Sequence, residues 1–146
     1  MQKRVLSLLV DNTAGVTTRV SGLFSRRGYN IDSITGGVTA DERFSRITVV
    51  CSGDELILEP DNSVCHELMM IKVAAKPEQR QGLISIADVF HAKVADVSVD
   101  SMILEMTGNH NKLEAFLELM GDYEILELAR TGMTGLSRGS QDVTYF

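Results

Sequence analysis

The feature that most constrains the fold is an order of secondary-structure elements that begins twice along the 146 residues. In the first half, alternating apolar residues predict strands at residues 5–10, 30–34 and 44–51. Between the first two of these, Val16, Val20, Leu23 and Phe24 recur at helical spacing and predict a helix at about residues 16–27. The first half therefore has the order βαββ and then breaks off near Pro60.

The second half repeats this order and completes it. The predicted elements alternate in type as strand, helix, strand, strand, helix and strand. The strands lie at residues 68–73, 94–99, 101–107 and 124–129. One helix follows Glu78 and carries Leu83 to Phe90, and the other carries Leu113 to Met120. This is the βαββαβ order of a ferredoxin-like unit. We therefore predict an α+β protein of two tandem ferredoxin-like units, the first of which lacks its last helix and strand.

Local signals refine these elements. Asp11, Asn12 or Thr13 is expected to cap the first helix, and Gly28 to end it in a left-handed turn. Asn109 or Asn111 is expected to cap the last helix. The pair at residues 36–37, Gly-Gly, interrupts the second strand and suggests a bulge.

The incomplete first unit has three explanations. A short helical run at residues 55–59 stops at Pro60, where the missing helix and strand are expected. A stretch between Glu59 and Pro60 can be disordered and missing from the sequence, the chain can be a deletion variant, or another chain can cover the gap. We favour the first explanation. A βαββαβ unit without its last helix and strand leaves its first strand with an open edge.

Composition excludes several classes of partner. The net charge is −6 and the pI about 5.0, which disfavours nucleic acid and anionic membranes. No apolar run approaches the roughly 20 residues of a membrane-spanning helix, and the first residues show no cleavage site, so we expect a cytoplasmic protein. Cys51 and Cys65 fit no metal or redox spacing, and we expect both to be reduced thiols.

Evidence for catalysis is weak. None of His66, His91 and His110 lies at metal-ligand spacing from a second ligand, so we predict no metal site. The glycine-rich run at residues 132–139 lacks the lysine and the following helix of a phosphate-binding loop, and we interpret it as a flexible tail. We predict no catalytic residue, although a small enzyme on a ferredoxin-like scaffold stays an alternative.

One segment has the chemistry of a ligand site. Residues 11–16 join a strand to a helix, whose first amide groups and positive dipole end suit a carboxylate. Gly15 has no Cβ and allows a ligand to approach the backbone, and Asn12 can both donate and accept hydrogen bonds. Taken alone, such a segment is more often only a cap and a turn.

Five stretches of the sequence, one of which contains most of this segment, resemble a known protein family. They lie at residues 8–16, 19–34, 45–49, 67–73 and 129–139, and the run Phe-Ser-Arg-Arg-Gly-Tyr-Asn-Ile at 24–31 is the most specific. Together they closely resemble the small regulatory subunit of acetolactate synthase. The resemblance implies an ACT domain at residues 1–59, a linker at 60–66 and a C-terminal ferredoxin-like domain at 67–146.

The resemblance also implies a function. The subunit of this family is non-catalytic and forms a homodimer. It joins a large catalytic subunit that carries thiamine diphosphate, Mg²⁺ and FAD, raises its activity and confers feedback inhibition by branched-chain amino acids, usually valine. The effector lies between two ACT domains, which implies contacts from Asn12, Gly15 and Val16 of one chain and Asn30 and Ile31 of the other. The alternative is an ACT-type amino-acid sensor for another enzyme or a transcription factor.

Overall fold

The computed structural model describes residues 3–52 and 62–140, which form two compact units. The first unit is Met1–Cys65 with Gly132–Phe146, and the second is His66–Thr131. The chain therefore passes between the units twice. Both units are built from antiparallel strands and helices, so the predicted α+β class is confirmed. No helix in the described ranges is long and apolar enough to cross a membrane.

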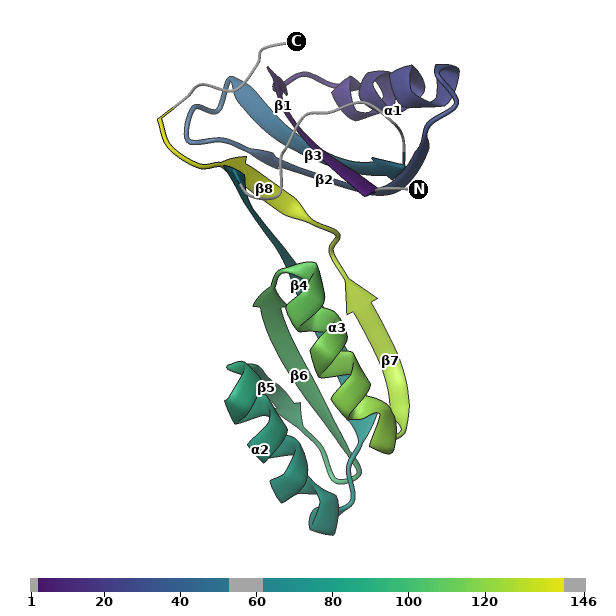
Figure 1. The fold of residues 1–146 in the computed structure, drawn as a ribbon, viewed down its shortest axis with the longest axis vertical. Coiled ribbons are helices and arrows are strands. Elements are labelled where there is room, and N and C mark those ends of the chain that lie inside the picture. Colours follow the sequence, from purple (N-terminus) through teal and green to yellow (C-terminus); the bar gives the residue numbers. More distant parts are fainter. Residues whose placement is uncertain (1–2, 53–61, 141–146) are drawn as a thin grey trace. The chain divides into compact units, whose positions relative to one another are not determined.

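The first unit is a three-stranded antiparallel sheet with one helix. Its elements are β1 (Lys3–Asp11), α1 (Val16–Arg26), β2 (Asn30–Val38) and β3 (Phe44–Ser52), and the strand order is β1-β3-β2. Helix α1 covers one face of the sheet (Figure 1). The core between helix and sheet consists of apolar residues at alternate strand positions and on one helix face, namely Leu8, Val20, Ile47, Val49 and Cys51.

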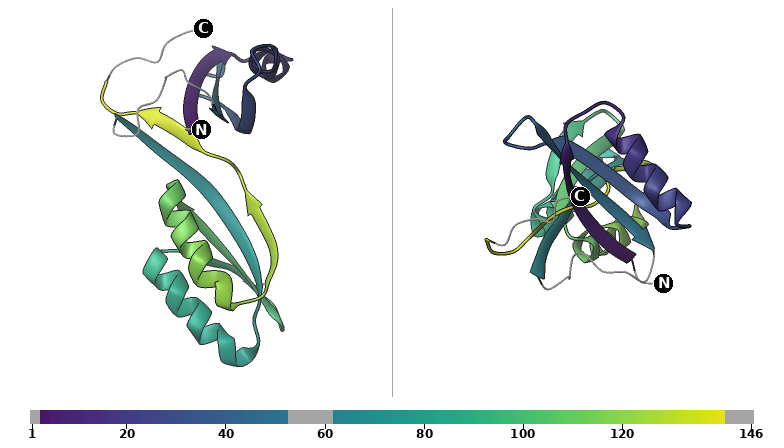
Figure 2. Two further views of the ribbon diagram at one scale, coloured as in Figure 1. Left: turned by 45° about the vertical axis from the view of Figure 1, so that its right-hand side comes forward. Right: turned by 90° about the horizontal axis from the view of Figure 1, so that it is seen from above.

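The second unit has the complete βαββαβ order. Its strands are β4 (Ser63–Ala74), β5 (Lys93–Val97), β6 (Ser101–Gly108) and β7 (Ile125–Arg130), in the sheet order β5-β6-β4-β7. Its helices are η2 (Pro77–Gln79), α2 (Arg80–Phe90), α3 (His110–Leu119) and η3 (Met120–Asp122). Helices α2 and α3 cover the same face of this sheet (Figure 2). This is the ferredoxin-like arrangement.

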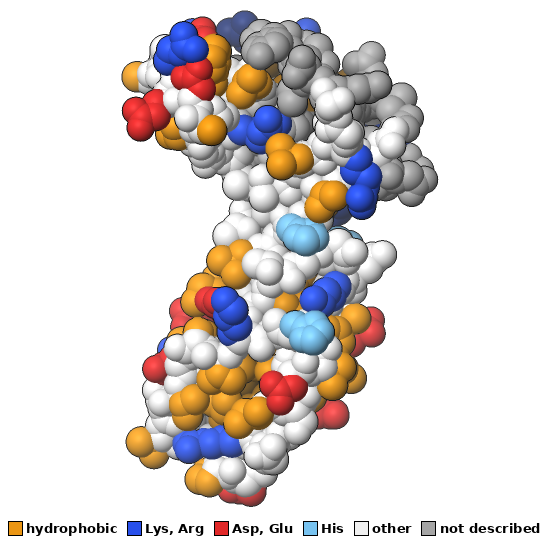
Figure 3. Space-filling model, turned by 90° about the vertical axis from the view of Figure 1, so that its left-hand side faces the viewer, with side chains coloured by type: hydrophobic (Ala, Val, Ile, Leu, Met, Phe, Trp, Pro, Cys, Tyr) orange, Lys and Arg blue, Asp and Glu red, His pale blue; other side chains and the backbone are white. Residues whose placement is uncertain are grey.

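The core of the second unit is large and continuous. Twelve buried residues form it, among them the fully buried Leu83, Leu104 and Phe116. The Phe90 and Phe116 rings pack edge to face with centroids 5.4 Å apart. Figure 3 shows further hydrophobic side chains gathered on the surface of this unit, and Val89 of α2 is one of the most exposed at 75%.

Every strand and helix predicted within the described residues is present, but three local predictions need correction. Helix α1 is capped by Gly15, at φ 78°, and no side chain of residues 11–13 caps it. The bulge in β2 lies between Ile31 and Ser33, whereas Gly36 and Gly37 continue the ladder with β3. Gly28 does adopt a left-handed φ of 73° at the end of α1, as predicted.

The third correction concerns the glycine-rich run, which is not a flexible tail. Residues 132–138, here called the C-terminal strap, contain the strand β8 (Thr134–Ser137), which pairs with β4. At Gly135 a Cβ atom would lie 2.5 Å from Cys65 Sγ, so only glycine allows this close approach.

Asn109, not Asn111, caps α3 by accepting from the Lys112 amide at 2.9 Å.

Some predictions concern residues outside the ranges that the structure describes. The helical run at 55–59, the junction between Glu59 and Pro60, and the last six residues lie outside the described residues. The predicted domain bounds stay a prediction. The structure also groups the C-terminal strap with the first unit, although the strap follows the second unit in sequence.

Candidate effector-binding site

The loop between β1 and α1 is held by hydrogen bonds from the turn that precedes β3. The Asn12 side chain donates to the Glu42 carbonyl oxygen at 2.9 Å and accepts from Ser45 Oγ at 3.1 Å. The Asn12 amide donates to the Arg43 carbonyl oxygen at 2.7 Å. Asn12 therefore has a fixed position beside the helix start, although it is exposed.

The N-terminus of α1 is open to a ligand. Gly15 is the N-cap residue, no side chain within the described ranges caps the helix through a hydrogen bond, and its first turn has no acidic residue. The Arg19 amide makes the first intrahelical bond, to the Gly15 carbonyl oxygen at 3.0 Å, so the amides of Thr17 and Thr18 come before the ladder begins. Such amides and the helix dipole attract a carboxylate.

Gly15 and Val16, the other two predicted ligand-binding residues of this loop, have different surroundings. A Cβ atom added at Gly15 would meet no heavy atom of the described residues within 4 Å, so these residues leave the space over the backbone open. Val16 begins α1 and packs partly buried against the core of the first unit. Val16 therefore positions the helix start, and its amide donates to the Thr13 carbonyl oxygen at 3.4 Å.

Asn30 and Ile31 begin β2. Asn30 is exposed, and its side chain donates to Asp32 Oδ1 at 3.2 Å. Ile31 is paired with Cys51 and packs against the same core as Val16. Asn30 therefore presents a polar side chain outward, whereas Ile31 offers mainly its backbone.

One chain does not bring the two groups together. Asp11, next to the loop, pairs with Phe44 at one end of β3, and Asn30 pairs with Ser52 at the other. The eight residue steps between these ends of β3 span about 27 Å at the usual strand rise. A site that uses both groups therefore needs a second copy of the chain.

The sequence predicts a turn at residues 39–43, but it did not reveal that this turn fixes Asn12. The Arg43 guanidinium donates to both carboxylate oxygens of Asp41, with Nη2 to Oδ2 at 2.6 Å, and these hydrogen bonds lower the pKa of Asp41 below its usual range. The Arg43 amide also donates to Asp41 Oδ1 at 3.1 Å. The signal in the sequence was the spacing Asp-x-Arg in a turn, which by itself names no partner for Asn12.

Side chains that commonly bind metals do not gather into a site. Among residues 3–52 and 62–140, no three His, Cys, Asp or Glu side chains come together in a way that could hold a metal ion. His110 instead lies on α3 with its Nδ1 3.7 Å from Glu114 Oε1.

Comparison with known proteins identifies the family. Residues 6–59 match the model of the ACT domain of the acetohydroxyacid synthase small subunit, and residues 66–139 match the model of the small subunit of acetolactate synthase. A probable acetolactate synthase small subunit of Archaeoglobus fulgidus is 40% identical over 157 residues, which cover 95% of this chain and 99% of the relative. The acetolactate synthase small subunit of Bacillus subtilis is 39% identical over 159 residues, covering 95% and 92%.

A solved structure agrees. The acetolactate synthase small subunit of Thermotoga maritima superposes with a TM-score of 0.84 at 31% identity, covering 97% of this chain and 100% of that one. The stretch of 157 residues shared with the archaeal relative is longer than the 146-residue chain, so at least 11 of its positions have no counterpart here. The chain belongs to the family of acetolactate synthase small subunits.

Proposed function

We propose that this chain regulates acetolactate synthase. It binds the large catalytic subunit, raises its activity and lowers that activity again when L-valine or a related branched-chain amino acid binds. The chain itself carries no catalytic residue and binds no cofactor. The thiamine diphosphate, Mg²⁺ and FAD expected for the reaction belong to the catalytic partner.

The open N-terminus of α1 is the observation that carries the effector part of this proposal. The helix has no side-chain cap and no acidic residue in its first turn, and Asn12 is fixed beside it. An amino-acid carboxylate at the Thr17 and Thr18 amides satisfies these donors, and Gly15 leaves room for it. Asn30 of a second copy supplies a polar partner for the ammonium or carboxylate group.

The mechanism is thermodynamic linkage. Valine that spans two copies binds best to the arrangement that brings the loop of one chain near Asn30 of the other. It then favours the state of the catalytic subunit that goes with this arrangement. An effector sensed at tens of micromolar binds with about −6 kcal/mol, and it shifts the equilibrium only by the difference between its affinities for the two states.

The first test is a calorimetric titration of the full chain with L-valine, L-leucine, L-isoleucine and D-valine. We expect saturable binding of L-valine and no binding of D-valine. Asn12→Asp keeps the acceptor for Ser45 but places a negative charge beside the effector carboxylate, so it should weaken binding by about tenfold to a hundredfold. Asn111→Ala, at an exposed position of α3 in the second unit, is the matched control and should bind as the natural chain does.

The second test adds the catalytic subunit. The chain should co-purify with it and raise its turnover, and L-valine should reverse the increase for the natural chain but not for Asn12→Asp. Turnover that does not respond to the chain would contradict the regulatory role. If the chain raises turnover but L-valine does not lower it again, the activating role stands and the role in feedback inhibition is contradicted.

A further inference from the structure

Ser45 of β3 is a buried serine that contacts the loop between β1 and α1. It is 9% exposed and pairs with Val10 of β1, on the sheet face that carries the core residues Ile47 and Val49. Its hydroxyl donates to Asn12 Oδ1 at 3.1 Å. The core of the first unit therefore ends, beside the loop, in a hydroxyl that is bound to the side chain proposed to contact the effector.

Two neighbours fix the orientation of the Asn12 side-chain amide. The Glu42 carbonyl oxygen can only accept, so the amide atom that faces it at 2.9 Å is Nδ2. Oδ1 then faces Ser45, whose hydroxyl is able to donate to it. Because the amide is held at both of its ends, it cannot rotate freely although Asn12 is exposed.

The turn that supplies the Glu42 carbonyl oxygen is held by contacts of its own. The Asp41 carboxylate accepts from the Arg43 guanidinium and from the Arg43 amide. The Arg43 carbonyl oxygen in turn accepts from the Asn12 amide at 2.7 Å. The turn therefore holds the main chain and one end of the side chain of Asn12, and Ser45 holds the other end.

This arrangement decides what Asn12 has left to offer. Nδ2 carries two hydrogens, and among residues 3–52 and 62–140 only the Glu42 carbonyl oxygen accepts one of them. The second hydrogen is a donor beside the start of α1, where the helix dipole attracts an anion and repels an ammonium group. The effector group that suits both the dipole and this donor is a carboxylate.

We infer that Ser45 is a positioning residue of the effector site. It holds the Asn12 amide so that Nδ2 donates to the carboxylate of a free amino acid, and it contacts no effector itself. The inference rests on the proposed function and specifies its ligand, because an amino acid whose carboxylate is blocked or neutral loses this contact.

The first test is a calorimetric titration of the full chain with L-valine. Ser45→Ala frees one end of the Asn12 amide and should raise the dissociation constant about threefold to tenfold, as expected for one hydrogen bond. Ser45→Cys, with nearly the same shape and only a weak donor, should weaken binding in the same direction. L-valinamide, which has a neutral amide in place of the carboxylate, should not bind the natural chain.

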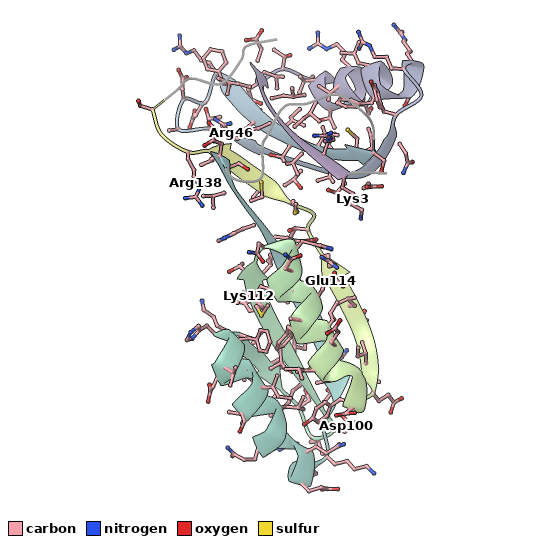
Figure 4. All side chains as sticks on the ribbon, in the orientation of Figure 1. Lys3, Arg46, Asp100, Lys112, Glu114 and Arg138 are labelled. Atoms are coloured by element: carbon pink, nitrogen blue, oxygen red, sulfur yellow. The ribbon has the colours of Figure 1, made fainter. Side chains whose placement is uncertain are left out.

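The matched control is Ser7→Ala. Ser7 is a buried serine of the same sheet, 6% exposed, and its hydroxyl accepts from Arg46 Nη1 at 2.8 Å. Arg46, which projects from β3 in the first unit, is labelled in Figure 4. Ser7 has no hydrogen bond to Asn12, so Ser7→Ala should leave valine affinity unchanged. Circular dichroism verifies that each variant is folded.

A double-mutant cycle separates positioning from a general loss of structure. If Ser45 acts through Asn12, Ser45→Ala should weaken binding further by less than about twofold once Asn12 is already replaced by alanine. A purely structural role would lower affinity by the same factor in both backgrounds. NMR titration with L-valine extends the measurement to the weaker affinity of the Asn12→Ala chain.

The NMR signals of the Asn12 side-chain amide give a readout without any effector. Ser45→Ala should shift or broaden them, whereas Ser7→Ala should not. Natural affinity in folded Ser45→Ala, equal losses in both backgrounds or unchanged Asn12 signals would overturn the inference. The proposed function fails in a different way, when the natural chain binds none of the branched-chain amino acids, and the Asn12 signals then still decide whether Ser45 positions this amide.

Discussion

The Arg130 guanidinium of β7 donates to both carboxylate oxygens of Glu67 of β4, from Nε to Oε1 at 3.1 Å and from Nη2 to Oε2 at 2.8 Å. Its third nitrogen donates to Glu114 of α3 at 2.8 Å. Glu67 is only 6% exposed, so its carboxylate is nearly removed from water. The hydrogen bond to Glu67 is the main reason that the pKa of Arg130 is raised above its usual range.

Arg130→Met should therefore destabilise the chain. It leaves the Glu67 carboxylate buried without its cation, and we expect a loss of about 2–3 kcal/mol in the free energy of unfolding. Urea denaturation followed by circular dichroism measures it. Because the Arg130 pKa is raised, its contribution is present at neutral and mildly alkaline pH and is lost only as pH rises above the ordinary guanidinium range.

The matched control for Arg130→Met is Lys72→Met. Lys72 pairs with Glu127 at 3.4 Å between the same two strands, but both side chains are more exposed, at 40% and 77%. This variant should change stability by less than about 0.5 kcal/mol. Equal losses from the two variants would show that burial of Glu67 does not matter.

Gly132→Ala should detach the C-terminal strap. Gly132 has φ 85°, and a Cβ atom there would lie 2.7 Å from Ser33 Cβ. We expect a loss of about 2–3 kcal/mol from strain and overlap together, measured by urea denaturation, and faster hydrogen exchange in the strap. Ser33→Gly in the same chain should recover part of the loss. Gly22→Ala is the control. It lies inside α1, where an added Cβ atom would meet no heavy atom of the described residues within 4 Å beyond the helix's own backbone, so it should stabilise the chain by about 0.5–1 kcal/mol.

Thr48→Val should stabilise the chain. Thr48 of β3 is 1% exposed, and its Oγ1 has no hydrogen-bond partner among residues 3–52 and 62–140. Valine has nearly the same shape without the unsatisfied hydroxyl, so the free energy of unfolding should rise by about 1 kcal/mol. Thr107→Val, at an exposed position of β6, should change it little. A loss of stability on Thr48→Val would mean that the hydroxyl has a partner in solution.

The two thiols should react at different rates with iodoacetamide. Cys51 is 4% exposed, and burial first and the charge of Asp32 second raise its pKa, so it holds less of the reactive thiolate near pH 8. We expect Cys65 to be alkylated first, as seen by mass spectrometry of the intact chain. Cys65→Ser should then resist labelling in the folded state, whereas Cys51→Ser should label as fast as the natural chain. Equal rates would contradict the buried position of Cys51.

Local sequence was enough for the family and for the other helices and strands discussed here, but not for β8. The apolar spacing from Val16 to Phe24 predicts α1, and Gly28 ends it in a left-handed turn, because both signals act within a few residues of the chain. The same holds for the βαββαβ order of the second unit, which follows from alternating and helical apolar patterns. The motif that includes Asn30 and Ile31 also named the family, which the comparisons then showed.

The contacts between residues far apart in the chain could be determined only from the tertiary structure. The Asn12 side chain is bound by Glu42 and Ser45, so it is not the cap of α1 that its position in sequence favours. Gly132 lies against Ser33 because a glycine there lets the strap approach the first sheet, a contact that no local pattern encodes. The two groups of residues proposed to bind the effector lie at opposite ends of one sheet because β1 and β2 run parallel on either side of β3, so distance along the chain could not place them.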